Sequence, residues 1–129
     1  MNRTLRTVAL GATVFFGLAA APSQGPAVRN VMREKLVHAQ MILEAVVTSD
    51  WLNLERHSRE LEGLTRDPRW TVLKYPEYAE HSAAFVRAVQ NLTRVAAKRD
   101  LETVPQAYVE VTLKCVDCHR SIARARLAK

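Results

Sequence analysis

Apolar residues recur every three or four positions along most of this chain, which is the pattern of amphipathic helices. The first such span runs from about Val28 to Val47, and its predicted inward stripe is Val28, Met32, Leu36, Ala39, Leu43 and Val46. Ser49 and Asp50 follow, and they suit the N-cap of a second helix. That helix is predicted from Trp51 to about Thr65, with an inward row of Trp51, Leu54, Ser58, Leu61 and Leu64.

Two more helices are predicted in the second half of the chain. Asp67 and Pro68 end the second helix, and Pro76 opens a third whose stripe is Tyr78, Phe85, Val89, Leu92 and Ala96. A fourth helix begins near Thr103 and is expected to turn inward Tyr108, Val111, Cys115, Cys118, His119 and Ile122. Alternation of period two is nowhere sustained. The predicted fold is therefore all-α, an antiparallel up-down-up-down four-helix bundle.

The first 23 residues have the pattern of a secretory signal peptide. Arg3 and Arg6 form a basic start, and a short apolar run from Val8 to Ala21 follows, with small residues after it. Cleavage after Ala21 or after Ser23 suits the small-residue rule, and an uncleaved membrane anchor is the alternative. We expect residues 24–129 to form one domain outside the cytoplasm, in the periplasm.

Charge excludes some partners. The formal net charge of +6 includes Arg3 and Arg6, so the predicted mature chain carries +4. There is no long basic run and no interleaving of basic and aromatic residues, so we expect no nucleic-acid partner. The mild excess suits a soluble protein that meets an acidic partner. No catalytic triad, carboxylate pair or phosphate loop is present, and an enzyme is not expected.

The strongest chemical signal is the run Cys115-Val116-Asp117-Cys118-His119, a C-x-x-C-H motif typical of covalent attachment of a c-type haem. Each thiol adds across one haem vinyl group, and the imidazole that follows can bind the iron. On a helix the two cysteines and His119 stand at i, i+3 and i+4 and share one face. The sequence thus predicts one covalent haem c per chain, held by Cys115 and Cys118, with His119 as an iron ligand.

Three other uses of the two cysteines compete with haem attachment. A disulfide between helical i, i+3 cysteines has poor geometry. A thioredoxin-type pair would accompany a βαβ pattern, which is not visible. Zinc would need a further ligand pair, whereas His38, His57 and His81 are scattered singly.

An exported four-helix chain with one C-x-x-C-H on its last helix resembles the class II c-type cytochromes, the family of cytochrome c-prime and its low-spin relatives. The resemblance covers the whole mature chain and extends to the segments 32–36, 70–78 and 108–115. It implies a haem in the bundle core, His119 as proximal ligand and a first-helix residue on the distal side. Bundles of this family often pair through their first two helices, so a homodimer is also expected.

The distal residue predicted from bundle geometry is Met32. In an up-down bundle the late part of the fourth helix faces the early part of the first, where Met32 lies on the predicted inward stripe. Met41 is nine residues further on, about 13 Å along the axis, and His38 is off that row. Three roles stay open: Met32 binds the iron, Met32 only covers it, or a histidine takes its place.

The functional expectation follows from these ligands. With His119 and Met32 on a low-spin iron, the resemblance implies a periplasmic electron carrier that exchanges electrons with redox partner proteins. The alternative is a five-coordinate haem protein like cytochrome c-prime, which binds or scavenges small gases such as nitric oxide. A third reading is an accessory haem subunit anchored by an uncleaved first segment.

Overall fold

The computed structural model describes residues 26–70 and 76–128. It contains α1 (Pro26–Thr48), α2 (Trp51–Leu64), the short 3-10 helix η1 (Pro68–Trp70), α3 (Pro76–Ala97) and α4 (Thr103–Leu127), and these ranges hold no strand. The prediction of an all-helical chain is confirmed for this part. The predicted signal peptide (1–23) and the segment 71–75 lie outside the described residues. Among the described helices, none has both the length and the apolarity needed to cross a membrane.

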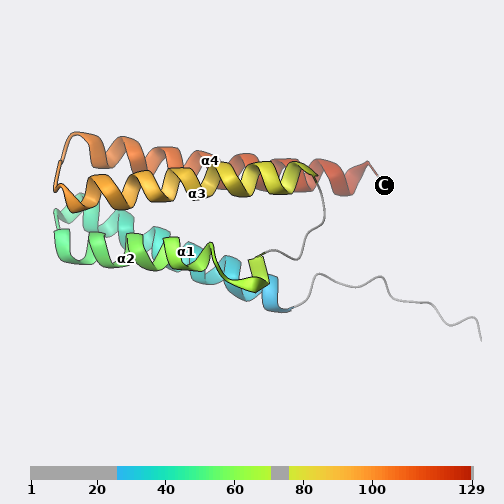
Figure 1. Cartoon of the computed structure of the whole chain (residues 1–129), viewed down its shortest axis with the longest axis horizontal. Coiled ribbons are helices and arrows are strands. Elements are labelled where there is room, and N and C mark those ends of the chain that lie inside the picture. Colours follow the sequence, from blue (N-terminus) through green and yellow to red (C-terminus); the bar gives the residue numbers. More distant parts are fainter. Residues whose placement is uncertain (1–25, 71–75, 129) are drawn as a thin grey trace, which may run out of the picture.

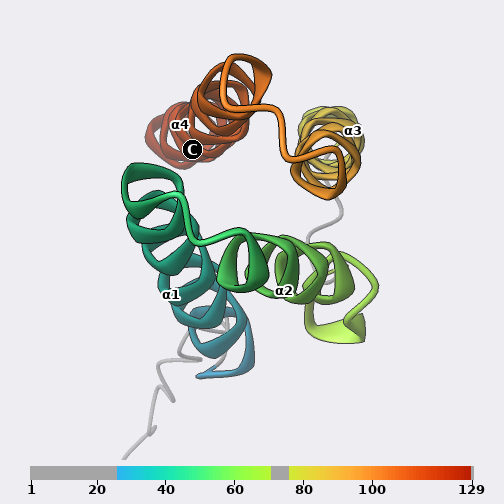
Figure 2. The same cartoon turned by 90° about the vertical axis from the view of Figure 1, so that its left-hand side faces the viewer.

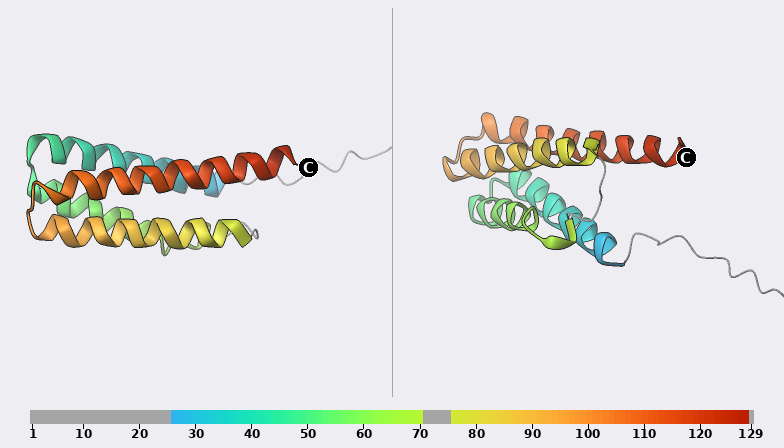
Figure 3. Two further views of the ribbon diagram at one scale, coloured as in Figure 1. Left: turned by 90° about the horizontal axis from the view of Figure 1, so that it is seen from above. Right: turned by 45° about the vertical axis from the view of Figure 1, so that its right-hand side comes forward.

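The four helices lie side by side as two pairs. α1 packs along α2, α3 packs along α4, and α2 also contacts α3, whereas α1 and α4 touch less. Figure 1 shows the two pairs one above the other with their connecting turns at the same end, and Figure 2 looks onto that end. In the right-hand view of Figure 3 the pairs diverge toward the end where α4 terminates. Space between the helices therefore opens at that end.

Each pair is closed by a tight turn with one residue in the left-handed region. Ser49 has a φ of 56° between α1 and α2, and Arg99 has a φ of 54° between α3 and α4. Asp50 then caps α2, because its carboxylate accepts a hydrogen bond from the Asn53 backbone N–H at 3.1 Å. The predicted capping role of this carboxylate is confirmed.

The core consists of apolar side chains from all four helices. The predicted α3 stripe is confirmed in full, since Tyr78, Phe85, Val89, Leu92 and Ala96 are all buried. In α2 the buried residues are Leu54, Ser58 and Leu61, as that row predicts. In α2 and α3, a single row of residues read from the sequence therefore marks the side that packs into the core.

The predicted stripe of α1 is wrong at Leu36 and Leu43, whereas Met32 and Val46 of that stripe pack against the core. Leu36 and Leu43 are 58% and 47% exposed, whereas Val31, Ile42 and Ala45 are buried. α1 carries two apolar rows, and the row that enters the core also contains the polar residues Lys35 and His38. Counting apolar residues favoured the other row. The helix is rotated so that Leu36 and Leu43 face outward and Lys35 turns in.

Polar contacts fix the short segment η1 against α1 and α3. Arg69 donates to the Glu34 carboxylate at 3.2 and 3.3 Å and to Asp67. The Tyr78 hydroxyl donates to the backbone carbonyl of Trp70. The indole of Trp70 is consequently buried over the end of the bundle where the helix pairs diverge.

Candidate functional site

The C-x-x-C-H motif lies within the continuous helix α4, as its i, i+3, i+4 spacing predicts. Cys115 and Cys118 are free thiols, both partly buried and packed against the core cluster. His119 was also expected to turn inward, but its side chain is exposed. It is four residues after Cys115 on the same helix face, and it lines the cavity at the side that is open to solvent. The motif therefore presents its thiols to the interior and its imidazole to the rim.

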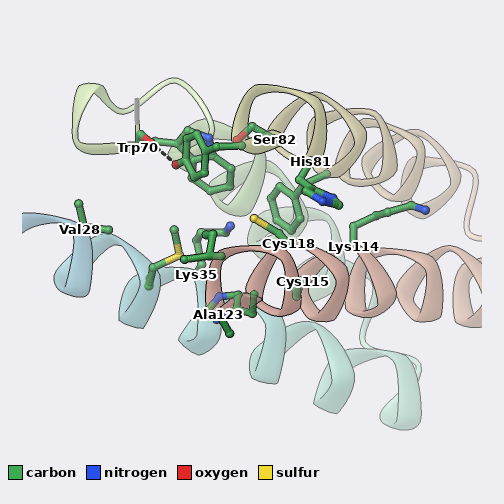
Figure 4. A pocket seen from close by; sticks show the side chains of 14 residues that line it. Val28, Lys35, Trp70, His81, Ser82, Lys114, Cys115, Cys118 and Ala123 are labelled. Carbon is green, nitrogen blue, oxygen red and sulfur yellow. Dashed lines mark hydrogen bonds between the residues drawn. The ribbon is translucent and has the colours of Figure 1, made fainter. Parts of the chain in front are cut away.

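A cavity of about 300 Å³ opens between α1, η1, α3 and α4 at the divergent end. Cys115, Cys118, His119 and Ile122 line it from α4, and Tyr78 and Phe85 line it from α3. Met32 lines it from α1, on the opposite wall. Figure 4 shows the Cys118 sulfur pointing into this space. The volume is at the lower end of the range for ligand-binding pockets, and the walls are mostly apolar.

A second hollow, of about 370 Å³, lies along the groove between α1 and α4. It shares with the first cavity the residues Met32, Lys35, Phe85, Cys115 and His119. These shared residues form the partition between the two spaces. Joining the two spaces would require these side chains, above all that of Lys35, to move.

The Lys35 side chain lies between the two spaces and lines both of them. Its ammonium nitrogen lies 3.5 Å from the centre of the Trp70 ring and 3.8 Å from that of Phe85, a cation–π arrangement. Burial lowers the pKa of this amine from 10.5 to about 8, against the opposing effect of the nearby Cys115 and Cys118 thiols. In Figure 4 the Lys35 side chain reaches into the space between the helices.

The two thiols are less acidic than an exposed cysteine. Burial raises the pKa of Cys115, and the Lys35 ammonium opposes that rise. The same two influences act on Cys118, with the neighbouring Cys115 adding to the rise in pKa. Burial therefore favours the protonated thiol over the thiolate at both positions.

The structure brings together all four predicted site residues. Cys115, Cys118, His119 and Met32 line the same cavity, with Met32 partly buried on α1. Met41 lines neither of the two spaces, which agrees with its place further along α1. His38 pairs instead with His57, their Nδ1 atoms 3.0 Å apart, and contributes to neither space.

Two residues of the cavity were missed by sequence reasoning. His81 lines the cavity from α3, and Lys35 lines it from α1. Both carried a signal: His81 is three residues after Tyr78 and four before Phe85, and Lys35 is four after Val31, so each lies on a buried row. A polar residue on an apolar row is the pattern that would have found them.

In the described ranges, no group of three or more His, Cys, Asp or Glu side chains is arranged to hold a metal ion by itself. Comparison with protein-family models, with curated proteins and with solved structures gave no match. The interpretation of the cavity therefore depends on its own residues.

Proposed function

We propose that this chain is an exported c-type cytochrome that holds one haem covalently through Cys115 and Cys118 and transfers electrons. His119 is the proximal iron ligand and Met32 the distal ligand in this proposal. The haem lies in the core of an antiparallel up-down-up-down bundle, and redox proteins are its partners. Export to the periplasm is part of the proposal and depends on residues 1–23.

One observation carries the proposal: two free thiols, an imidazole and a thioether line the same apolar-walled cavity. The thiols and imidazole come from one helix face of α4, and the thioether comes from α1. Thiols three residues apart suit the two vinyl groups, while His and Met are common axial ligands of c-type iron. The residues present therefore fit a covalently attached haem.

The surrounding side chains suit an apolar macrocycle with a polar edge. Tyr78 and Phe85 are buried, and they would exclude water from one side of the group. Lys35 is the exception, because its ammonium fills space that an apolar group would need. Its flexible stem can carry the amine to the rim while its methylenes stay in apolar contact. A bound haem supplies reversible one-electron chemistry, and the protein sets its potential through ligand and burial.

A second candidate function has one observation in its favour. Phe85 lines both spaces beside Met32, so an apolar ring is available to cover the distal side without binding iron. If Met32 only fills space, the sixth position is open to a small diatomic such as nitric oxide. The chain is then a gas-binding haem protein.

The proximal assignment is tested by absorption spectra of wild type, His119→Ala and His81→Ala. His81 is the matched control, because it lines the same cavity from α3. We expect His119→Ala to retain its thioether links but to change its ferric and ferrous spectra and its potential, and His81→Ala to keep those of the wild type. The opposite result, an unchanged His119→Ala and an altered His81→Ala, contradicts the assignment.

A further inference from the structure

The outer face formed by α1 and α4 exposes six large apolar side chains. From α1 it presents Leu36, Leu43 and Val47, and from α4 Val109, Leu113 and Val116, all between 39% and 76% exposed. We call these six residues the α1/α4 strip. Several large apolar side chains gathered on one face indicate an interaction site.

Packing and helical spacing place both halves of the strip on one face. The Tyr108 hydroxyl donates to the Ala39 carbonyl at 3.0 Å, which fixes α4 beside α1. Leu36 lines the hollow between these helices together with Cys115 and His119, and Val116 lines an adjoining hollow with the same two residues. Steps of three, four and seven residues then continue each row along its helix.

Charges at the two ends of the strip have opposite sign. Beyond Leu36 and Val116, at the divergent end, four arginines are exposed: Arg29, Arg33, Arg120 and Arg124. At the end that carries the turns, the exposed charges beside the strip are Glu44 on α1 and Glu102 at the start of α4. Figure 1 shows these two ends of α1 and α4 at opposite ends of the molecule. The face thus runs from basic through apolar to acidic.

We infer that a second copy of this chain docks on the α1/α4 strip, related by a two-fold axis perpendicular to the helices. This operation sets α1 against α1 and α4 against α4 in opposite directions, so the apolar middles meet. Arg33 of one copy then approaches Glu44 of the other, and Arg120 approaches Glu102. A two-fold axis parallel to the helices would instead set the two basic ends against each other and the two acidic ends against each other, which is unfavourable.

The second copy also covers the rim of the candidate site. His119 is exposed and lines the hollows on this face with Leu36 and Val116. Docking would remove this edge from water. The family resemblance implies pairing through the first two helices, which is a different face. The inference rests on the exposed residues alone and does not require the proposed haem.

Sedimentation velocity of the mature chain over a range of concentrations tests the inference. We expect a dimer, and we expect Leu43→Glu and Leu113→Glu each to raise its dissociation constant at least tenfold. Leu52→Glu is the matched control, because Leu52 is 79% exposed but lies on α2. Circular dichroism checks that each variant keeps its helices.

A charge exchange makes the test specific for the orientation. Arg33 and Glu44 are eleven residues apart on α1, about 16 Å along the axis, so they cannot pair within one copy. Arg33→Glu and Glu44→Arg should each weaken the dimer, and the double variant should restore it. A monomer at all concentrations, a dimer that only Leu52→Glu dissociates, or a double variant weaker than both single variants overturns the inference.

Discussion

Lys35 buries an ammonium group against two aromatic rings in the space that the proposal gives to a haem. Because burial lowers its pKa from 10.5 to about 8, the folded chain binds this proton less tightly than the unfolded chain. The buried charge lowers the free energy of unfolding by its full amount below pH 8, and this loss shrinks as the pH rises from 8 to 10.5. Converted from the pKa difference, that cost is about 3 kcal/mol.

We therefore expect Lys35→Met to stabilise the haem-free chain, obtained as the Cys115→Ala, Cys118→Ala variant. Denaturant unfolding at pH 7 should give a gain of up to about 3 kcal/mol, since a methionine of similar shape removes the buried charge. Lys114→Met is the control, because Lys114 lines the cavity but its amine points away from the other labelled residues in Figure 4. A gain of the same size in both variants would show that the charge of Lys35 is not the cause.

Met32 decides between the two candidate functions. If its sulfur binds the iron, the ferric wild type should be low-spin and carbon monoxide should enter the ferrous form slowly. Met32→Ala should then be high-spin, take up carbon monoxide readily, have a lower potential and lose about 2 kcal/mol of stability. Absorption spectra and stopped-flow mixing measure these changes.

Met41→Ala is the matched control for Met32→Ala. Met41 is also partly buried on α1 but lines neither space of the candidate site. It should leave the spin state and carbon monoxide uptake unchanged. A wild type that is already high-spin, with rapid uptake that neither variant alters, would favour the gas-binding function.

The contact between α1 and α2 brings together two histidines, His38 and His57. His38 and His57 bring their Nδ1 atoms within 3.0 Å, and Arg56 lies 3.3 Å from the Nε2 atom of His57. Burial first, then Arg56 and His38, lower the pKa of His57 below its usual 6.5. The fold thus favours the neutral imidazole, and its contribution to stability is complete above pH 6.5 and is lost as the pH falls.

Unfolding measured from pH 8 to pH 5 should show this loss as a falling free energy below pH 6.5. His57→Gln should flatten that part of the profile, because it removes the titrating group. Arg56→Gln should make the loss smaller, since one cause of the lowered pKa is gone. Profiles of equal slope in the wild type and both variants would show that His57 does not control the pH dependence.

The turn between α1 and α2 carries a small strain that glycine relieves. Ser49 has a φ of 56°, where a side chain is unfavourable. Ser49→Gly should therefore raise the free energy of unfolding by about 0.5 to 1 kcal/mol in a denaturant titration. Thr48→Gly, one residue earlier at the last position of α1, should instead lower it, because glycine is the poorer helix former. Destabilisation by both changes would argue against strain at Ser49.

At the scale of the whole molecule, the sequence predicted the helices better than their rotation. The bounds of α2, α3 and α4 agree with capping and proline signals at Asp50, Pro76 and Thr103. α3 has a single apolar stripe, so its inner face was also predictable. α1 has two, and only tertiary packing selects the row of Val31 and Ile42, because that row also contains Lys35 and His38 whereas the other row is wholly apolar.

The candidate site also contains some residues that the sequence predicts and others that it does not. Cys115, Cys118 and His119 could be predicted because their chemistry is contained in one local spacing. Lys35 and His81 lie on buried rows of α1 and α3, but a search for apolar periodicity passes over them because both side chains are polar. Met32 is predicted from bundle geometry, and it lies on the expected wall although Leu36 and Leu43 of the same stripe face outward.

The covalent haem is the central claim, and the intact mass of the wild-type protein tests it most directly. The protein is expressed with its first segment in a host competent in c-type maturation, purified and measured under denaturing conditions. We expect a mass equal to the mature chain plus one haem, and the mass of the bare chain for Cys115→Ala with Cys118→Ala. A folded, helical wild type with the mass of the bare chain would contradict the account.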